Sequence, residues 1–408
     1  MRYLVEWRLP EAGRQLLALA IGLALGLLIY SVPAKAADAL TNKADDLVQI
    51  VINEKVGFIN TQGELVIAPR FEEAFDFSTN GLTAVLENGQ WGYINAQGEM
   101  IIAPRFSRAW RFAANGLAGV TEKGKKFGYI NTKGKIVIPL RFESGWDFAA
   151  NGLAAVKENG KWGYINAQGK MVIAPRFENG WSFASNDMAA VKENGKWGYI
   201  NTHGKMVIAP KFENAGPFNA NGLAQVWDNG KRGCINMQGK MVIAPRFDYV
   251  GNFTANGLAQ VKKSGKWGYI DAQGETVIVP KFDQAESFAV NGLAAVQEKK
   301  NGKWGYINAQ GEMVIAPRFE FATGFAANGL AKIEENGKQG YINAQGRLVI
   351  APRFENAGTF AANGLAVVWE NDKLGYINTK GQIIVFIDKV NGHDVLKNSR
   401  SEIIWPRQ

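Results

Sequence analysis

Three short apolar runs recur at a regular interval along most of the chain, and residues 153–177 hold the clearest set. The runs cover residues 153–156, 161–166 and 170–177, and the second combines two aromatic residues with a β-branched one. Asn159-Gly160 separates the first two runs and suits a two-residue hairpin turn, because both of its positions tolerate positive φ. A glycine-containing turn precedes the third run. The pattern therefore predicts a three-stranded antiparallel β-meander.

Both faces of this meander carry apolar side chains. In the second run Trp162 and Tyr164 point to one face and Ile165 to the other. A sheet with two apolar faces has to be covered on both, and the neighbouring units are the predicted cover. Gly163 lies between the two aromatic residues, where the missing side chain allows a neighbouring backbone or ring to approach closely. Pro175 ends the third run, because proline cannot donate to a central ladder.

The meander repeats ten times when the chain is aligned on the glycine of the second run. The ten positions are Gly57, Gly92, Gly128, Gly163, Gly198, Gly233, Gly268, Gly305, Gly340 and Gly375. A fixed period of about 35 residues indicates a tandem-repeat architecture. The two longer spacings come from extra residues at the same predicted hairpin tip, and exposed tips tolerate insertions.

The unit reads K-W-G-Y-I-N-x-x-G-K-x-V-I-x-P-R-F-E, followed after a connector by N-G-L-A-x-V. Over roughly residues 47–385 this pattern resembles the WG-repeat family of bacterial proteins. The resemblance implies a fold and a structural class more than an activity. It marks these residues as the structural repeat signature: Trp91, Gly92, Trp162, Gly163, Trp197, Gly198, Trp267, Gly268, Trp304 and Gly305.

The repeat number bears on the overall architecture. Closed propellers typically have four to eight blades of four strands, whereas this chain has ten units of three predicted strands. No unit is visibly split between the two ends of the chain. We therefore expect an all-β, open, propeller-like spiral or solenoid, with a closed β-propeller as the alternative.

The two ends of the chain differ from the repeats. Residues 1–36 contain a basic leader, an apolar run at 16–30 and a small-residue site, Ala34-Lys35-Ala36, which predicts a cleaved export signal. The alternative is an uncleaved membrane anchor, although the run is shorter than the roughly 20 residues of a membrane span. We assign 37–46 to a linker, 47–387 to the repeats and 388–408 to a polar tail. The last unit lacks the proline and the Arg-Phe-Glu of the others, as expected of a cap.

Composition and charge limit the classes of partner that we expect this chain to bind. The chain is 47% hydrophobic and carries a formal charge of +9, of which the predicted signal contributes only a small part. Because no block of basic residues occurs, we expect no nucleic-acid binding. Membrane contact is expected only through residues 16–30, and only if the signal is retained. The one cysteine, Cys234, stands where other units have tyrosine and excludes an intramolecular disulfide.

The sequence offers no catalytic, metal or cofactor motif. Of the two histidines, His203 falls in a predicted loop and His393 in the tail. Carboxylates recur two positions after a basic residue, as in Arg176 and Glu178. They could be read as a glycosidase pair, but eight equivalent copies favour contacts between Arg and Glu of neighbouring units. We therefore predict that the chain is not an enzyme, with a cell-wall lytic enzyme as the weakest alternative.

One feature breaks the repeat in a directional way. Four residues after the Arg-Phe phenylalanine, the first four units carry Phe75, Trp110, Trp146 and Trp181, whereas later units carry Gly216, Gly251, Glu286, Thr323 and Gly358. We call the first four the aromatic strip. Its rings either bind a ligand or fill the connectors of thicker units.

These patterns predict an exported, non-catalytic binding or structural scaffold, located in the periplasm, outside the cell or at its surface. Its partner would be a protein or a cell-envelope glycan. The main alternative function is binding of envelope polysaccharide or peptidoglycan through the aromatic strip.

Overall fold

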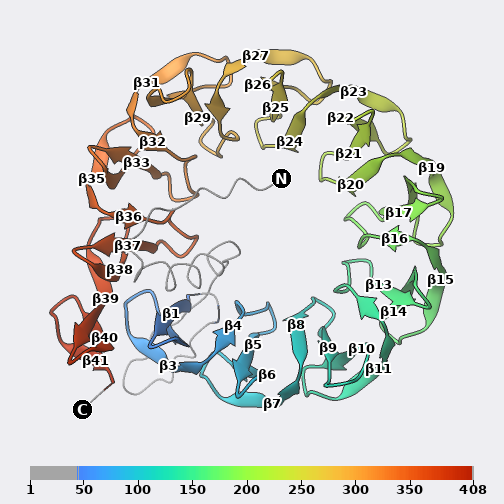
Figure 1. Ribbon diagram of the computed structural model, residues 1–408, viewed down its shortest axis with the longest axis horizontal. Helices are drawn as coiled ribbons and strands as arrows, with labels where there is room; N and C mark the ends of the chain where they lie inside the picture. Colours follow the sequence, from blue (N-terminus) through green and yellow to red (C-terminus); the bar gives the residue numbers. More distant parts are fainter. Residues whose placement is uncertain (1–43, 45, 407–408) are drawn as a thin grey trace.

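The computed structural model describes residues 44 and 46–406, and its regular elements are all β-strands. The strands form ten antiparallel sheets arranged around a ring, as Figure 1 shows. We number the sheets 1 to 10 in chain order. Each sheet runs from an inner strand near the centre of the ring to an outer strand at its circumference. The predicted export signal and most of the predicted linker lie outside the described residues.

Four sets of strands build the sheets. The innermost strands are β4 (Glu73–Ala74), β8 (Arg108–Phe112), β12 (Ser144–Gly145), β16 (Asn179–Gly180), β20 (Asn214–Phe218), β24 (Tyr249–Phe253), β28 (Gln284–Ala285), β32 (Phe321–Ala322) and β36 (Asn356–Ala357). The second strands are β1 (Val48–Ile52), β5 (Leu82–Glu87), β9 (Leu117–Thr121), β13 (Leu153–Glu158), β17 (Ala189–Glu193), β21 (Leu223–Asp228), β25 (Ala259–Lys263), β29 (Ala294–Gln297), β33 (Ala331–Glu335) and β37 (Ala366–Glu370). The third strands are β2 (Lys55–Ile59), β6 (Gln90–Asn95), β10 (Phe127–Asn131), β14 (Lys161–Asn166), β18 (Lys196–Ile200), β22 (Lys231–Asn236), β26 (Lys266–Ile270), β30 (Trp304–Ile307), β34 (Lys338–Ile342) and β38 (Lys373–Ile377). The outer strands are β3 (Leu65–Phe71), β7 (Met100–Phe106), β11 (Ile136–Phe142), β15 (Met171–Phe177), β19 (Met206–Phe212), β23 (Met241–Phe247), β27 (Thr276–Phe282), β31 (Met313–Phe319), β35 (Leu348–Phe354) and β39 (Ile383–Val390), and sheet 10 adds β40 (His393–Asn398) and β41 (Ile403–Trp405).

The number of strands per unit differs from the prediction of three. Sheets 2 to 9 have four strands, sheet 1 has three and sheet 10 has six. In sheet 4 the predicted strands are β13, β14 and β15, and the connector before them adds β12, where Gly145 pairs with Val156. Strand β12 is only two residues long, so no apolar alternation in the sequence reveals it.

The hairpin tips have the predicted geometry. Asn159 and Gly160 have φ values of 52° and 74°, as a two-residue turn with positive φ at both positions requires. On the other side of β14 the pairing with β15 is irregular, because the register moves from Trp162–Phe177 directly to Tyr164–Ile173. Three residues of the outer strand therefore bulge opposite Gly163.

The bulge explains the signature glycine. A Cβ atom on Gly163 would lie 2.5 Å from the carbonyl oxygen of Ile173 and 2.7 Å from the nitrogen of Pro175. The close approach of a neighbouring backbone, predicted from the sequence, is confirmed. The neighbour is the outer strand of the same sheet.

Adjacent sheets cover each other, which confirms the prediction for the two apolar faces. The tyrosine of the signature is buried, and its hydroxyl donates a hydrogen bond to a backbone carbonyl of the next sheet. Tyr164 donates to Trp181 over 2.9 Å, and Tyr199 donates to Gly216 over 2.8 Å. Burial raises the pKa of Cys234, which replaces this tyrosine in sheet 6, to about 12.

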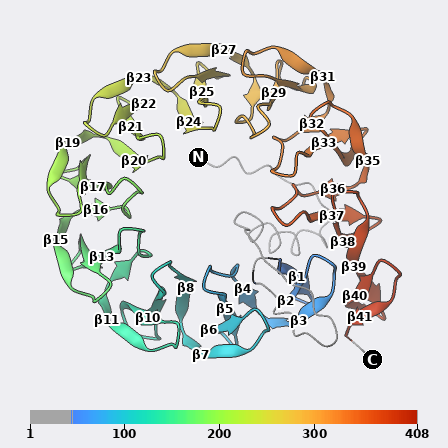
Figure 2. The same cartoon turned by 180° about the vertical axis from the view of Figure 1, so that it is seen from behind.

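The ring closes, so the closed propeller describes this chain better than the open spiral that we favoured. Figure 1 and Figure 2 both show sheet 1 beside sheet 10. The hydroxyl of Tyr376 in sheet 10 donates to the carbonyl of Gln49 in sheet 1 over 2.8 Å, which reproduces the contact between other sheets. Ile50 and Leu396 lie in one buried cluster across this seam. The seam thus combines the tyrosine contact of the other interfaces with contacts from β40, and the ring closes without a split unit.

The described part of the predicted polar tail, residues 388–406, extends the last sheet. Strand β40 pairs with β39, and β41 pairs with β40. Each outer strand from β3 to β35 contains a proline, whereas β39 contains none. Proline lacks the N–H that a further strand would need, so the outer strands of sheets 1 to 9 end their sheets. Gly375 and Phe386 pair in regular register, because β39 has no bulge there.

Candidate functional site

The aromatic strip follows the inner strands of four consecutive sheets. Phe75 comes directly after β4, Trp110 lies within β8, and Trp146 and Trp181 come directly after β12 and β16. The structure therefore places the strip in sheets 2 to 5, on the inner part of the ring. Each connector aromatic belongs to the sheet that follows it, because the innermost strand pairs forward.

The strip divides into two exposed and two packed rings. Trp146 and Trp181 are each 41% exposed, and their ring centroids lie 5.9 Å apart. Phe75 instead stacks on Trp91 at 5.0 Å, and Trp110 meets Phe127 edge-on at 5.2 Å. Within the described part of the chain, Trp146 and Trp181 are the only strip members in ring contact with each other. We call these two residues the exposed pair.

Each indole of the exposed pair is supported by a signature tryptophan of its own sheet. Trp162 stacks against Trp146 at 6.3 Å with an interplanar angle of 21°. Trp197 stacks against Trp181 at 6.2 Å with the same angle. The contacts therefore join four indoles in a row across sheets 4 and 5. Trp197 is buried and anchors one end of this row.

In four of the five later sheets the larger side chain at this level comes from the second strand, whereas sheet 8 has Glu286 beside Ala295. The backbone N–H of Trp146 donates to Ala155, so a small residue of the second strand lies beside the ring. Sheet 10 reverses this arrangement, with Gly358 beside Val367. The need to fill space therefore explains why each sheet has one large side chain, either at the strip position or beside it on the second strand. It does not account for the exposure of Trp146 and Trp181.

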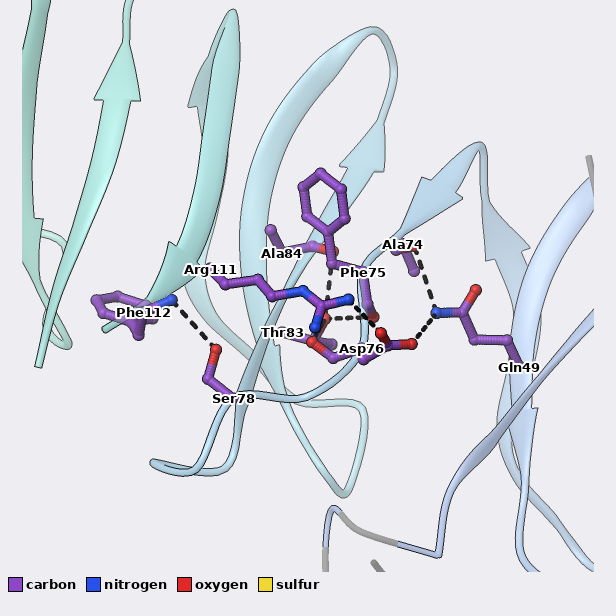
Figure 3. Close-up of polar contacts among 9 residues, drawn as sticks. All are labelled: Gln49, Ala74, Phe75, Asp76, Ser78, Thr83, Ala84, Arg111 and Phe112. Carbon is purple, nitrogen blue, oxygen red and sulfur yellow. Dashed lines mark hydrogen bonds and ion pairs between the residues drawn. The ribbon is translucent and has the colours of Figure 1, made fainter. Parts of the chain in front are cut away.

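A polar network lies beside the packed half of the strip (Figure 3). The Arg111 guanidinium of sheet 3 forms an ion pair with the buried carboxylate of Asp76 in sheet 2. The Gln49 side chain of sheet 1 donates to the same carboxylate over 3.5 Å. Burial raises the pKa of Asp76, and the nearby Arg111 offsets part of this increase. Together with the Tyr376–Gln49 bond, these contacts join sheets 10, 1, 2 and 3.

The signature residues hold the sheets together. Tryptophans 197 and 304 are buried, whereas 91, 162 and 267 are half-buried. The signature glycines before the last unit all face the outer-strand backbone as Gly163 does. Trp162 and Trp197 also support the exposed pair.

The recurring carboxylates are used at the hairpin tips. The carboxylate of Glu178 accepts a hydrogen bond from the Gly195 N–H, and its counterparts repeat this contact in other sheets. The predicted pair of Arg176 and Glu178 is wrong, because the Arg176 guanidinium donates to the carbonyl of Gly204 in the next sheet, over 2.7 Å. Ion pairs between sheets do occur, with other partners, as in Lys338 and Glu355 at 2.6 Å.

One unusual side chain was missed at the sequence level. Arg232 occupies the position of the signature tryptophan in sheet 6, and its guanidinium carbon lies 4.9 Å from the Trp227 ring centroid and 4.7 Å from that of Tyr249. The signal was available, because K-R-G-C-I-N departs twice from K-W-G-Y-I-N.

The described residues contain neither a metal-binding cluster nor a membrane-spanning helix. No group of three or more His, Cys, Asp and Glu side chains there is arranged to hold a metal ion. No helix there is long and apolar enough to cross a membrane. His203 and His393 are both exposed.

Comparisons with known proteins concern the repeat first. The family model described as "WG containing repeat" matches residues 57–91, 91–125, 127–162, 162–197, 197–231, 233–267, 267–304, 304–338 and 340–373. These nine segments cover most of the chain. No curated protein matches it.

Among solved structures, the chain resembles a crystal structure titled "the eukaryotic initiation factor", with a TM-score of 0.52 and 11% identity over 85% of this chain and 96% of that one. This likeness concerns the fold alone. The computationally designed Ika8 protein gives a TM-score of 0.35 at 7% identity, over 67% of this chain and 93% of that one. The extracellular domain of the putative one component system BT4673 from B. thetaiotaomicron gives 0.28 at 8% identity, over 91% of this chain and 72% of that one.

Proposed function

The chain belongs to the WG-repeat family, and on that premise we propose that it is a non-catalytic binding scaffold with its ligand site at the exposed pair. The observation that carries this proposal is the 41% exposure of both Trp146 and Trp181, which contact each other and stack on Trp162 and Trp197. Large aromatic rings are usually covered, so two exposed neighbours indicate a surface for a partner. The use of the recurring carboxylates at hairpin tips supports the non-catalytic part of the proposal.

The ligand we propose is a polysaccharide of the cell envelope. Sugar rings present apolar C–H faces that pack on flat indoles, while their hydroxyls need hydrogen-bond partners. Residues with hydroxyl, carboxylate or amide groups adjoin the exposed pair in sequence and reach the surface: Ser144, Asp147, Asn179 and Ser182. This mixture of flat rings and polar groups suits a glycan better than an apolar protein segment.

The test is a tryptophan substitution with a buried control. We expect Trp181→Ala to weaken binding to envelope polysaccharide by about 1–2 kcal/mol, with a small loss of folding stability, because the ring is already partly in water. Trp304→Ala removes a buried ring in sheet 8, so it should cost about 3–5 kcal/mol of stability and leave the affinity of the folded protein unchanged. Calorimetric titration and denaturant unfolding separate the two effects. Unchanged affinity of Trp181→Ala would contradict the proposed site.

We also propose that the protein is exported and that residues 1–36 are removed, on the basis of the leader, apolar run and Ala34-Lys35-Ala36 described above. The mature protein should then begin at Ala37. Intact-mass spectrometry of the protein recovered outside the cytoplasm measures this directly. A mass that includes Met1 would favour the membrane anchor instead.

A further inference from the structure

Arg232 places a positive charge at a position where most other sheets have an aromatic ring. It faces Trp227 across the β21–β22 pair, where sheets 4 and 5 have lysine opposite tryptophan. Tyr249, the first residue of β24, reaches it from sheet 7. Trp227, Arg232 and Tyr249 all depart from the repeat and lie together. The guanidinium of Arg232 contacts both aromatic rings.

The two rings fix the guanidinium without using its hydrogen-bond donors. Cation–π contact acts between the flat face of the guanidinium and the ring, so the N–H groups at its edge stay available. Arginine has five such donors in a planar fork that matches a carboxylate or phosphate. Arg232 is half-buried, and covering part of a cation raises its demand for an opposite charge.

In the described part of the chain, no acidic side chain pairs with Arg232. Among residues 44 and 46–406, the Arg232 side chain makes neither an ion pair nor a hydrogen bond to another residue. The nearby acids are engaged elsewhere, since Asp248 pairs with Lys231 at 2.5 Å and Glu213 accepts from the Gly230 N–H at 3.1 Å. By contrast, Arg111 also lies near an aromatic ring but has Asp76 as its partner.

The position of Arg232 connects it to the exposed pair. Trp197, which supports Trp181, occupies the same repeat position in sheet 5 as Arg232 does in sheet 6. Arg232 therefore lies one sheet further along the ring than Trp197. Trp227 and Tyr249, which flank it, occupy the repeat positions of Lys192 and Asn214. A ligand chain that stacks on the exposed pair and follows the ring would reach the guanidinium.

We propose that Arg232 binds the anionic group of an acidic polysaccharide, either the carboxylate of a uronic acid or a phosphate along the chain. This inference rests on the proposed function, because it assigns the charge of the same ligand. Trp227 and Tyr249 orient the guanidinium, and the exposed pair carries the neighbouring sugar rings.

Titrations with matched oligosaccharides test the proposal on the full chain. We expect a uronic-acid oligomer to bind about tenfold more tightly than a neutral oligomer of equal length at low salt, as a charge-assisted bidentate contact implies. Arg232→Gln should abolish this preference and leave affinity for the neutral oligomer unchanged. Lys240→Gln removes the same charge from an exposed residue of the same sheet without releasing Asp248 from Lys231, and it should keep the preference. A glycerol-phosphate polymer serves as the second anionic probe, and a preference for it that depends on Arg232 would assign the anionic group to phosphate.

The failures of the two proposals are distinguishable. If Trp181→Ala leaves every affinity unchanged while Arg232→Gln still removes the anion preference, the exposed pair is wrong and the arginine site stands. If no oligosaccharide binds, the glycan function fails. NMR of the arginine side-chain N–H groups with glucuronate and inorganic phosphate then tests Arg232 alone. An Arg232 signal that moves with neither anion, or an equal loss of preference in Arg232→Gln and Lys240→Gln, would overturn the inference.

Discussion

Replacing Gly163 by alanine should lower the free energy of unfolding by about 3 kcal/mol, the upper part of the usual range for overpacking. The new Cβ would lie 2.5 Å from the Ile173 carbonyl oxygen and 2.7 Å from the Pro175 nitrogen. Both are backbone atoms of the bulged outer strand, so relief requires the strand itself to move. Denaturant unfolding of the variant measures the loss.

Gly375→Ala provides the matched control at the same repeat position. Its Cβ would meet nothing closer than the Val385 carbonyl oxygen at 3.4 Å, because β39 lacks the bulge. We expect a change below about 1 kcal/mol, as for an ordinary tolerated substitution. Equal losses in the two variants would show that the bulge is not the reason for the glycine.

Leu396→Ala should destabilise the protein by about 2–5 kcal/mol, the range for truncating a buried leucine. Leu396 is fully buried in β40 and belongs to the cluster that joins sheets 10 and 1. The loss should be concentrated at this seam, because stability in stacked repeats depends on nearest neighbours. Hydrogen exchange should therefore accelerate first in sheets 1 and 10.

Ile403→Ala is the control for the seam, because Ile403 lies in β41 of the same sheet but is 38% exposed. It should change stability by less than about 1 kcal/mol. Uniform acceleration of exchange in all ten sheets of Leu396→Ala would indicate that the ring unfolds as one cooperative unit. The seam would then not unfold separately from the rest of the ring.

The strand pattern was readable from the sequence wherever a local rule determined it. Asn159-Gly160 specified its turn through positive φ, and Trp162, Tyr164 and Ile165 specified two apolar faces through alternation. The inner strand β12 escaped detection because two residues define no period. Ring closure also could not be read, because it depends on small rotations between ten sheets that no single residue determines.

Side-chain partners were harder to predict than strands. Arg176 and Glu178 are close in sequence, but they contact different turns of sheet 5. The arginine donates to Gly204 between β18 and β19, whereas the glutamate accepts from Gly195 at the tip between β17 and β18. In the aromatic strip, exposure depends on what adjoins each ring. Phe75 and Trp146 each stack on a signature tryptophan, yet Phe75 is half-buried and Trp146 is 41% exposed. The residue type at the signature position therefore does not predict the exposure.

The seam between Gln49 and Tyr376 also restricts how this chain can change in length. An open array gains or loses a unit at either end, and its other units are unaffected. Here both ends are occupied by contact with each other, through the Tyr376–Gln49 bond and the shared cluster around Leu396. An added or deleted copy would change the rotation required at every interface or break the seam. Duplication of a unit, the usual route by which repeat proteins grow, is therefore limited here by the circumference of the ring.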